Sequence, residues 1–175
     1  RAGGSSGTPR DRDAGHRPSS GSSRVRRPIG FALGTWLIGN LPLPLAFALA
    51  PGGDLGTSAP GLHLPPWVFA VVWTVISPCL GVAAWRIWCR RDRPGAVEAL
   101  AVFGLCFLIL LAFVPVTAAA HEQLVTAMLD LVGLAGAFVT AWAYRRIDPG
   151  TLPWMAPLLL WMPTTAALKW ATLPG

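Results

Sequence analysis

The sequence is poor in charge, and this scarcity excludes most classes of soluble protein. Only 13% of its 175 residues are Asp, Glu, Lys or Arg, whereas a soluble domain usually has about 25%. The hydrophobic fraction is 53%, and nine Trp accompany a single Tyr. So few charges cannot cover the surface of a soluble enzyme, and so apolar a chain is not wholly disordered. A small polytopic membrane protein is the class that fits.

The sequence also lacks the patterns of familiar catalytic and metal sites. His121-Glu122 begins like the HExxH zinc motif, but Val125 stands where the second His belongs. The three cysteines have no CxxC spacing, and neither a glycine-rich phosphate loop nor a GxSxG elbow occurs. We expect no metal site and no required cofactor, and the sequence favours a protein that is not an enzyme.

Residues 1–28 form a basic tail. Seven of the 14 cationic residues lie in the first 27 positions, among Gly, Ser and Pro with almost nothing apolar. Such a segment cannot bury enough surface to offset its ordering entropy, so we predict disorder. No aromatic residue interleaves the arginines, and an apolar segment follows at once. We therefore expect the tail to contact anionic lipid rather than nucleic acid.

Five apolar stretches are long enough to cross a bilayer, which takes about 20 residues in a helix. The predicted spans are residues 29–50, 67–89, 97–119, 123–145 and 151–170. Short connections make successive helices antiparallel neighbours. The sequence therefore predicts an all-α polytopic membrane protein, with residues 29–175 forming a five-transmembrane-helix bundle. Pro42, Pro44 and Pro51 should kink or end the first helix.

The distribution of cations predicts the orientation in the membrane. With five spans, 13 of the 14 Lys and Arg residues fall on one side and only Lys169 falls on the other. Cations concentrate on the cytoplasmic side, so we expect a multi-pass protein of a bacterial cell membrane with its N-terminus cytoplasmic and its C-terminus external. A second interpretation makes the first span a signal peptide cleaved after Ala48-Leu49-Ala50, although Pro51 follows directly.

Small and polar residues recur at helical spacing in three of the spans. The fourth span carries Thr126, Asp130, Gly133, Ala137, Thr140 and Tyr144 along one face, and the second carries Ala70, Thr74, Ser77, Gly81 and Ala84. Gly30 and Gly34 form a GxxxG motif in the first span. Small residues allow helix backbones to approach closely within lipid, so these faces predict helix packing.

Asp130 is the one acidic residue well inside a predicted span, because Glu98 lies at the very start of the third one. A carboxylate in a bilayer costs about 3 kcal/mol or more, so it should face the bundle interior and have a partner. No other span carries Lys or Arg well inside it, so we expect hydroxyls and water as partners. A structural role and a role in ligand or proton handling remain equally open. If the role is structural, Asp130→Asn should leave stability unchanged or improve it.

Most Trp residues lie at the ends of spans, whereas Trp73 and Trp161 lie deeper. A buried indole offers a flat surface that suits a planar apolar ligand, although packing against other helices is the alternative.

Three segments are similar to helices of one membrane family. Residues 64–74 read LPPWVFAVVWT, with GVAAW at 81–85; residues 127–132 read AMLDLV, and residues 157–161 read PLLLW. Together these strings resemble the second, fourth and fifth helices of the TspO/MBR family, the tryptophan-rich sensory or translocator proteins. The similarity extends from Gly30 to the C-terminus.

The resemblance implies a five-helix protein, often a homodimer, that binds porphyrins and sterol-like molecules in a pocket near the first loop. Its expected partners are the lipid bilayer, a small apolar ligand such as a tetrapyrrole or haem-type molecule, and a second copy of the chain. The predicted ligand-binding residues are Trp67, Phe69, Trp73, Ser77, Asp130, Trp161 and Thr165. We expect Trp161 to be the main stacking surface, opposite Trp73 and Ser77.

Several positions depart from the pattern of that family. Ser77 stands where the family usually has Tyr, and Leu111 and Val114 stand where its third helix has Asn and Trp. Thr165 takes the place of a small residue and Lys169 that of a late Asn. The chain therefore resembles a divergent member whose ligand differs.

Three functions are compatible with these features. The leading hypothesis is binding, sensing or transport of a tetrapyrrole or another flat apolar molecule. The alternatives are a structural or assembly subunit without a ligand, favoured by the small-residue faces, and a membrane enzyme that degrades bound porphyrin, which the missing aromatic groups weaken.

Overall fold

The computed structural model describes residues 21–41, 44, 58–59, 62–63, 66–120 and 123–171. The helices in these ranges are α1 (Gly21–Asn40), α3 (Pro66–Trp88), α4 (Ala96–Ala120), α5 (Gln123–Ile147) and α6 (Leu152–Ala171). The 3-10 turn η1 (Pro149–Thr151) precedes α6, and the two-residue strands β1 (Ser58–Ala59) and β2 (Leu62–His63) pair antiparallel. The prediction of an all-α five-helix bundle is confirmed.

The predicted spans and the observed helices agree to within a few residues for α3, α4, α5 and α6. The first boundary was wrong, because α1 begins at Gly21, inside the tail that the composition predicted to be disordered. Extending an existing helix is far easier than nucleating one, so a helix formed by the apolar residues continues into the polar ones. Ala48-Leu49-Ala50, where signal cleavage was considered, lies outside the described residues.

α1 ends at Asn40, and Leu41 is a bend immediately before Pro42. The residue before a proline is disfavoured in helical conformation, which accounts for the end of α1 at this point. Pro42 and Pro51 themselves lie outside the described residues.

Three of the helices are long and apolar enough to cross a membrane by length and hydropathy alone. Within the described ranges, these stretches are Trp67–Trp88, Ala96–Phe113 and Leu124–Ile147. α6 contains three prolines and Lys169, which lower its hydropathy.

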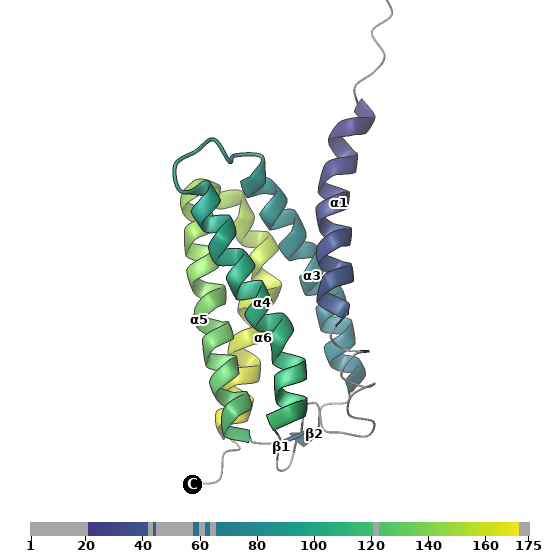
Figure 1. The fold of residues 1–175 in the computed structure, drawn as a ribbon, viewed down its shortest axis with the longest axis vertical. Coiled ribbons are helices and arrows are strands. Elements are labelled where there is room, and N and C mark those ends of the chain that lie inside the picture. Colours follow the sequence, from purple (N-terminus) through teal and green to yellow (C-terminus); the bar gives the residue numbers. More distant parts are fainter. Residues whose placement is uncertain are drawn as a thin grey trace, which may run out of the picture.

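The five helices run roughly side by side, with α1 lying along α3 (Figure 1). α3 contacts α6 and α4, while α5 packs between α4 and α6. One end of the bundle carries the α3–α4 connection and η1; we call it the arginine end, after residues described below. The opposite end carries β1, β2 and the last residues of α6, and we call it the hairpin end (Figure 1).

The small-residue face predicted for α5 is confirmed as an interior face. Thr126, Asp130, Ala137, Thr140 and Tyr144 are all buried, as is Gly133 between them. Leu131 and Phe138, on the other side of the helix, are exposed on the surface that would meet lipid.

Close packing of α1 on α3 depends on glycines other than the predicted GxxxG pair. A Cβ added at Gly81 would lie 2.5 Å from the backbone oxygen of Phe31 and 2.8 Å from Cα of Ala32. A Cβ added at Gly30 or Gly34 would meet nothing within 4 Å. The prediction for Gly81 in the second span is therefore confirmed, and the prediction that Gly30 and Gly34 form the packing face of the first span was wrong.

Candidate functional site

The predicted ligand site begins with an aromatic pair at the α3–α6 interface. Phe69 lies in the first turns of α3, and Trp161 lies near the middle of α6. Their ring centroids are 5.4 Å apart and their planes meet at 82°. This edge-to-face geometry is one that aromatic pairs prefer. Both side chains are half-buried, so the pair joins the two helices without being fully enclosed.

A second element of the site is a buried ion pair between α5 and α6. The Nζ atom of Lys169 lies 3.0 Å from Oδ2 of Asp130. Asp130 is 3% exposed and Lys169 is 9% exposed. The expectation that hydroxyls and water would be the partners of Asp130 was wrong, because a cation near the end of the neighbouring helix reaches it.

The geometry of the two helices explains how this pair forms. Asp130 lies seven residues from the hairpin end of α5, and Lys169 lies two residues from the same end of α6. This places their Cα atoms at depths that differ by roughly 8 Å along the bundle. A lysine side chain with four methylenes is long enough to direct its ammonium inward and close that difference.

Phe113 of α4 completes the surroundings of the cation. The ammonium of Lys169 lies 4.2 Å from the centroid of the Phe113 ring. A cation over an aromatic face is attracted by the quadrupole of the ring, more strongly where water is excluded. The charge of Lys169 is therefore shared among α4, α5 and α6.

Trp161, Thr165 and Lys169 follow one another at four-residue intervals on α6, so they lie along one side of that helix. Thr165 is buried, and its hydroxyl donates a hydrogen bond to the carbonyl oxygen of Met162 at 3.1 Å. The aromatic pair and the ion pair are thus two ends of one continuous surface of α6. We call the set Phe69, Phe113, Asp130, Trp161, Thr165 and Lys169 the hairpin-half cluster.

The structure does not bring all predicted residues to this cluster. Trp67 is 65% exposed in the first turn of α3, so it does not line the interior. Trp73 is partly buried and packs against the hydrophobic core. Ser77 is fully buried, and its side chain lies against Gly39 of α1, where an added Cβ would collide with it. The structure therefore assigns Ser77 to the α1–α3 contact instead of the surface opposite Trp161.

Sequence reasoning missed Lys169 and Phe113. The signal for Lys169 was present, because it is the only cation assigned to the side of the bundle on which Asp130 lies. A buried carboxylate requires a partner, and pairing it with that cation would have identified the contact. Nothing in the residue spacing of α4 marks Phe113.

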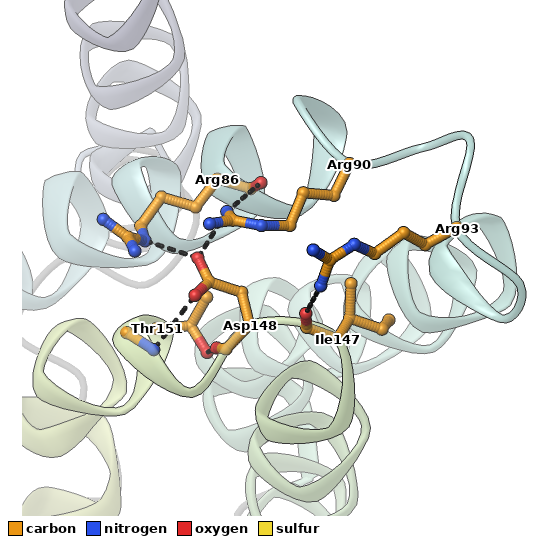
Figure 2. A network of polar contacts seen from close by, with 7 residues as sticks. Arg86, Arg90, Arg93, Ile147, Asp148 and Thr151 are labelled. Atoms are coloured by element: carbon orange, nitrogen blue, oxygen red, sulfur yellow. Dashed lines mark hydrogen bonds and ion pairs between the residues drawn. The ribbon is translucent and has the colours of Figure 1, made fainter.

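A separate charged junction lies at the arginine end (Figure 2). The carboxylate of Asp148, just before η1, accepts hydrogen bonds from Nε of Arg86 at 2.8 Å and from an Nη atom of Arg90 at 2.5 Å. Arg93 donates to the carbonyl oxygen of Ile147 at 2.7 Å. Three arginines from the end of α3 and the connection after it therefore hold the segment between α5 and α6.

Asp148 also caps the turn that follows it. Its Oδ1 accepts a hydrogen bond from the amide of Gly150 at 3.1 Å, and its own carbonyl accepts one from the hydroxyl of Thr151 at 2.8 Å. Asp followed by Pro is a favourable start for a helical turn. Burial raises the pKa of Asp148, but hydrogen bonds from Arg86 and Gly150 and the charges of Arg86 and Arg90 outweigh it, so the pKa lies below its ordinary value.

Comparison with known proteins adds one finding. The sequence model of the TspO/MBR family matches residues 55–173, which include α3, α4, α5 and α6. No match was found among curated proteins.

Proposed function

Because the chain belongs to the TspO/MBR family of integral membrane proteins, we propose that it binds a tetrapyrrole or a similar flat apolar molecule within the bundle, as a transporter or a sensor. The site we propose is the hairpin-half cluster, whose residues come from α3, α4, α5 and α6. No cofactor is needed for binding of this kind.

The observation that carries the proposal is the Phe69–Trp161 pair. The two rings meet nearly at right angles, so they are not stacked face to face. Trp161 is only partly buried and borders the hydrophobic core without being enclosed by it. An indole in this state offers a large flat surface between two helices, and planar ligands bind such surfaces by stacking.

Replacing Trp161 with leucine should weaken binding of protoporphyrin IX roughly ten- to a hundredfold. Leucine keeps the helix apolar but removes the flat face, and stacking on an aromatic side chain contributes about 1–3 kcal/mol for planar bases. Affinity is measured by titration in detergent micelles, following the absorbance band of the porphyrin.

Trp154→Leu is the matched control for this experiment. Trp154 lies on the same helix near the arginine end and is 39% exposed, so its loss should change affinity by less than about twofold. Equal losses in the two variants would remove Trp161 from the site.

A structural or assembly subunit is the second candidate function. It is favoured by the α5 face, which is buried against the neighbouring helices along its whole described length. It is also favoured by Ser77, which lies where the resemblance led us to expect a ligand-lining Tyr but packs on α1. Under this function neither tryptophan variant would bind porphyrin, nor would the parent protein.

We also propose that the arginine end faces the cytoplasm of a bacterial cell. In support, the N-terminal side of α1, the α3–α4 connection and η1 share that end (Figure 1), and cations concentrate on the cytoplasmic side of membrane proteins. Reporter fusions after Arg91 and Arg146 should therefore be cytoplasmic, and a fusion after Gly175 should be external. The reverse pattern would contradict this orientation.

A further inference from the structure

We infer that the arginine end binds the phosphate of an anionic phospholipid between the end of α3 and η1, through the guanidinium groups of Arg86 and Arg90. This site lies at the opposite end of the bundle from the ligand site proposed above, and it does not depend on that proposal. The lipid is held at one position on the protein, which distinguishes the site from a general attraction between cations and an anionic membrane.

The two guanidinium groups converge on Asp148 and keep donors for a second acceptor. Nε of Arg86 and an Nη atom of Arg90 both bond to Oδ2 of Asp148, whereas the two Nη atoms of Arg86 lie on the far side of its guanidinium (Figure 2). The same Nη atom of Arg90 also donates to the carbonyl oxygen of Arg86 at 3.2 Å. A guanidinium has five N–H donors in a planar fork, so both groups can bond to a phosphate as well.

The exposure of these side chains makes the cations accessible and the acid inaccessible. The side chains of Arg86 and Arg90 are 31% and 32% exposed, whereas that of Asp148 is 7% exposed. An anion approaching from outside the bundle therefore meets the guanidinium groups before the carboxylate. The planar fork of arginine matches the oxygens of a phosphate, which it can bind through two parallel hydrogen bonds.

Gly150 gives Arg86 its position against η1. A Cβ added at Gly150 would lie 2.3 Å from an Nη atom of Arg86 and 3.1 Å from its Cζ atom. The guanidinium therefore lies directly against the backbone of the turn, in space that only glycine leaves open. With Asp148 holding its Nε, Arg86 is fixed in place before a ligand arrives, which reduces the entropy lost on binding.

The charge of this end favours a ligand with a negative charge. Residues 86–98 and 142–154 contain six arginines and three acids, a net charge of +3. Arg86 and Arg90 share the single carboxylate of Asp148, so together the three groups keep one positive charge. The phosphodiester of an anionic phospholipid supplies the one negative charge that would neutralise them.

Exposed tryptophans at the same end indicate that the anion is a lipid headgroup. Trp88 and Trp142 are 47% and 55% exposed. The Cζ atom of Arg91 lies 5.3 Å from the centroid of the Trp88 ring, and that of Arg146 lies 3.6 Å from the centroid of Trp142. Tryptophan is enriched where the membrane meets water, at the level of the headgroups. The arginines beside these rings therefore lie at the depth of lipid phosphates, and basic sites between helices at this depth suit anionic headgroups.

The test counts lipids bound to the full chain by native mass spectrometry from a neutral detergent, at increasing concentrations of dioctanoyl phosphatidylglycerol. The parent protein should bind it more tightly than dioctanoyl phosphatidylcholine, whose choline already neutralises the phosphate. Arg86→Gln should weaken binding of the phosphatidylglycerol roughly ten- to a hundredfold, the contribution of hydrogen bonds from a charged group. Circular dichroism of each variant measures its helix content.

Arg145→Gln is the matched control. Arg145 is exposed at the same end, so this variant removes the same charge without touching the contacts of Asp148. Its affinity should change by less than about threefold at physiological salt, because exposed charges farther apart than about 8 Å are largely screened.

Gly150→Ala separates geometry from charge. It keeps all the arginines and Asp148, but the added Cβ displaces the guanidinium of Arg86. The displaced atoms are the flexible end of a side chain, so the fold should be retained. Affinity for the phosphatidylglycerol should fall by about three- to tenfold, a loss that a merely structural ion pair would not produce.

Three results would overturn the inference. Equal losses in Arg86→Gln and Arg145→Gln, or unchanged affinity in Gly150→Ala, would show that net charge attracts the lipid and that no site exists. Equal affinity of the parent protein for the two lipids would remove the selectivity for an anion. Displacement of the lipid by excess inorganic phosphate would assign the arginines to a free phosphate instead of a headgroup.

Discussion

Replacing Lys169 with glutamine should lower the free energy of unfolding by about 3–5 kcal/mol, because it leaves the buried carboxylate of Asp130 without a cation. The energy needed to dehydrate two buried charges can equal or exceed their attraction, but removing one partner leaves the other uncompensated. The loss is measured by reversible denaturation in detergent micelles, with helix content as the signal.

The double variant Asp130→Asn with Lys169→Gln is the control for this prediction. It replaces the charged pair by two amides, so it should recover most of the stability lost in the single variants. If the loss in free energy of unfolding in the double variant equalled the sum of the two single losses, the contact between Asp130 and Lys169 would contribute no interaction energy. The same reasoning replaces the sequence-based expectation for Asp130→Asn, which removes the carboxylate that pairs with the buried ammonium of Lys169 and should destabilise the protein.

Replacing Asp148 with alanine should lower the free energy of unfolding by about 2–3 kcal/mol. The variant loses the acceptor for Arg86 and Arg90 and the cap of the turn before α6. Caps contribute about 0.5–2 kcal/mol, and the partly exposed arginines keep the ion-pair contribution modest. Asp92→Ala, at an exposed acid in the α3–α4 connection, should change stability by less than about 0.5 kcal/mol.

The stabilisation that Asp148 contributes should also depend on pH, and it should be lost at low pH. Its pKa is lower in the folded protein than its ordinary value, so the folded state binds the proton less readily than the unfolded chain. The stabilisation is therefore complete above about pH 4, the pKa of an unfolded aspartate, and is lost as pH falls through the folded pKa. An unchanged difference between parent and Asp148→Ala from pH 7 to pH 2 would contradict this account.

Hydropathy and charge placement were sufficient to predict the helices of this protein. Lipid allows only segments whose backbone hydrogen bonds are satisfied internally, so an apolar stretch of the right length becomes a helix with little ambiguity. α3, α4, α5 and α6 follow this rule closely. The start of α1 does not, because the first eight residues from Gly21 include no apolar side chain except Val25 and Pro28, and composition alone does not show that a helix begun elsewhere extends through them.

Partners between helices were harder to predict, because each depends on how two helices are rotated against each other. Gly30 and Gly34 have the spacing of a packing motif, yet at the contact between α1 and α3 it is Gly39 and Gly81 that meet side chains or backbone of the neighbouring helix. Periodicity defines a face but not which neighbour covers it. The same limit applies to Ser77, which is buried but whose contact is with α1, while Thr74 of the same predicted face is exposed.

The polar contacts escaped prediction for a related reason. Arg86, Arg90 and Arg93 were interpreted only as topology signals, and Asp148 was not considered with them, although it is one of eight acids in the chain. Asp130 was expected to meet hydroxyls because no other span places a cation at the same depth in the membrane, as judged from position in the sequence. A long lysine side chain extends along the bundle, so depth along the helix axis does not decide which charges meet.

The most direct test of the central claim is an equilibrium titration of the purified full chain with protoporphyrin IX. Saturable quenching of tryptophan fluorescence with a matching shift of the porphyrin band is the expected result, and both signals should weaken roughly ten- to a hundredfold in Trp161→Leu. The absence of saturable binding by the parent protein, or binding that is unchanged in Trp161→Leu, would contradict a ligand site built on the Phe69–Trp161 pair.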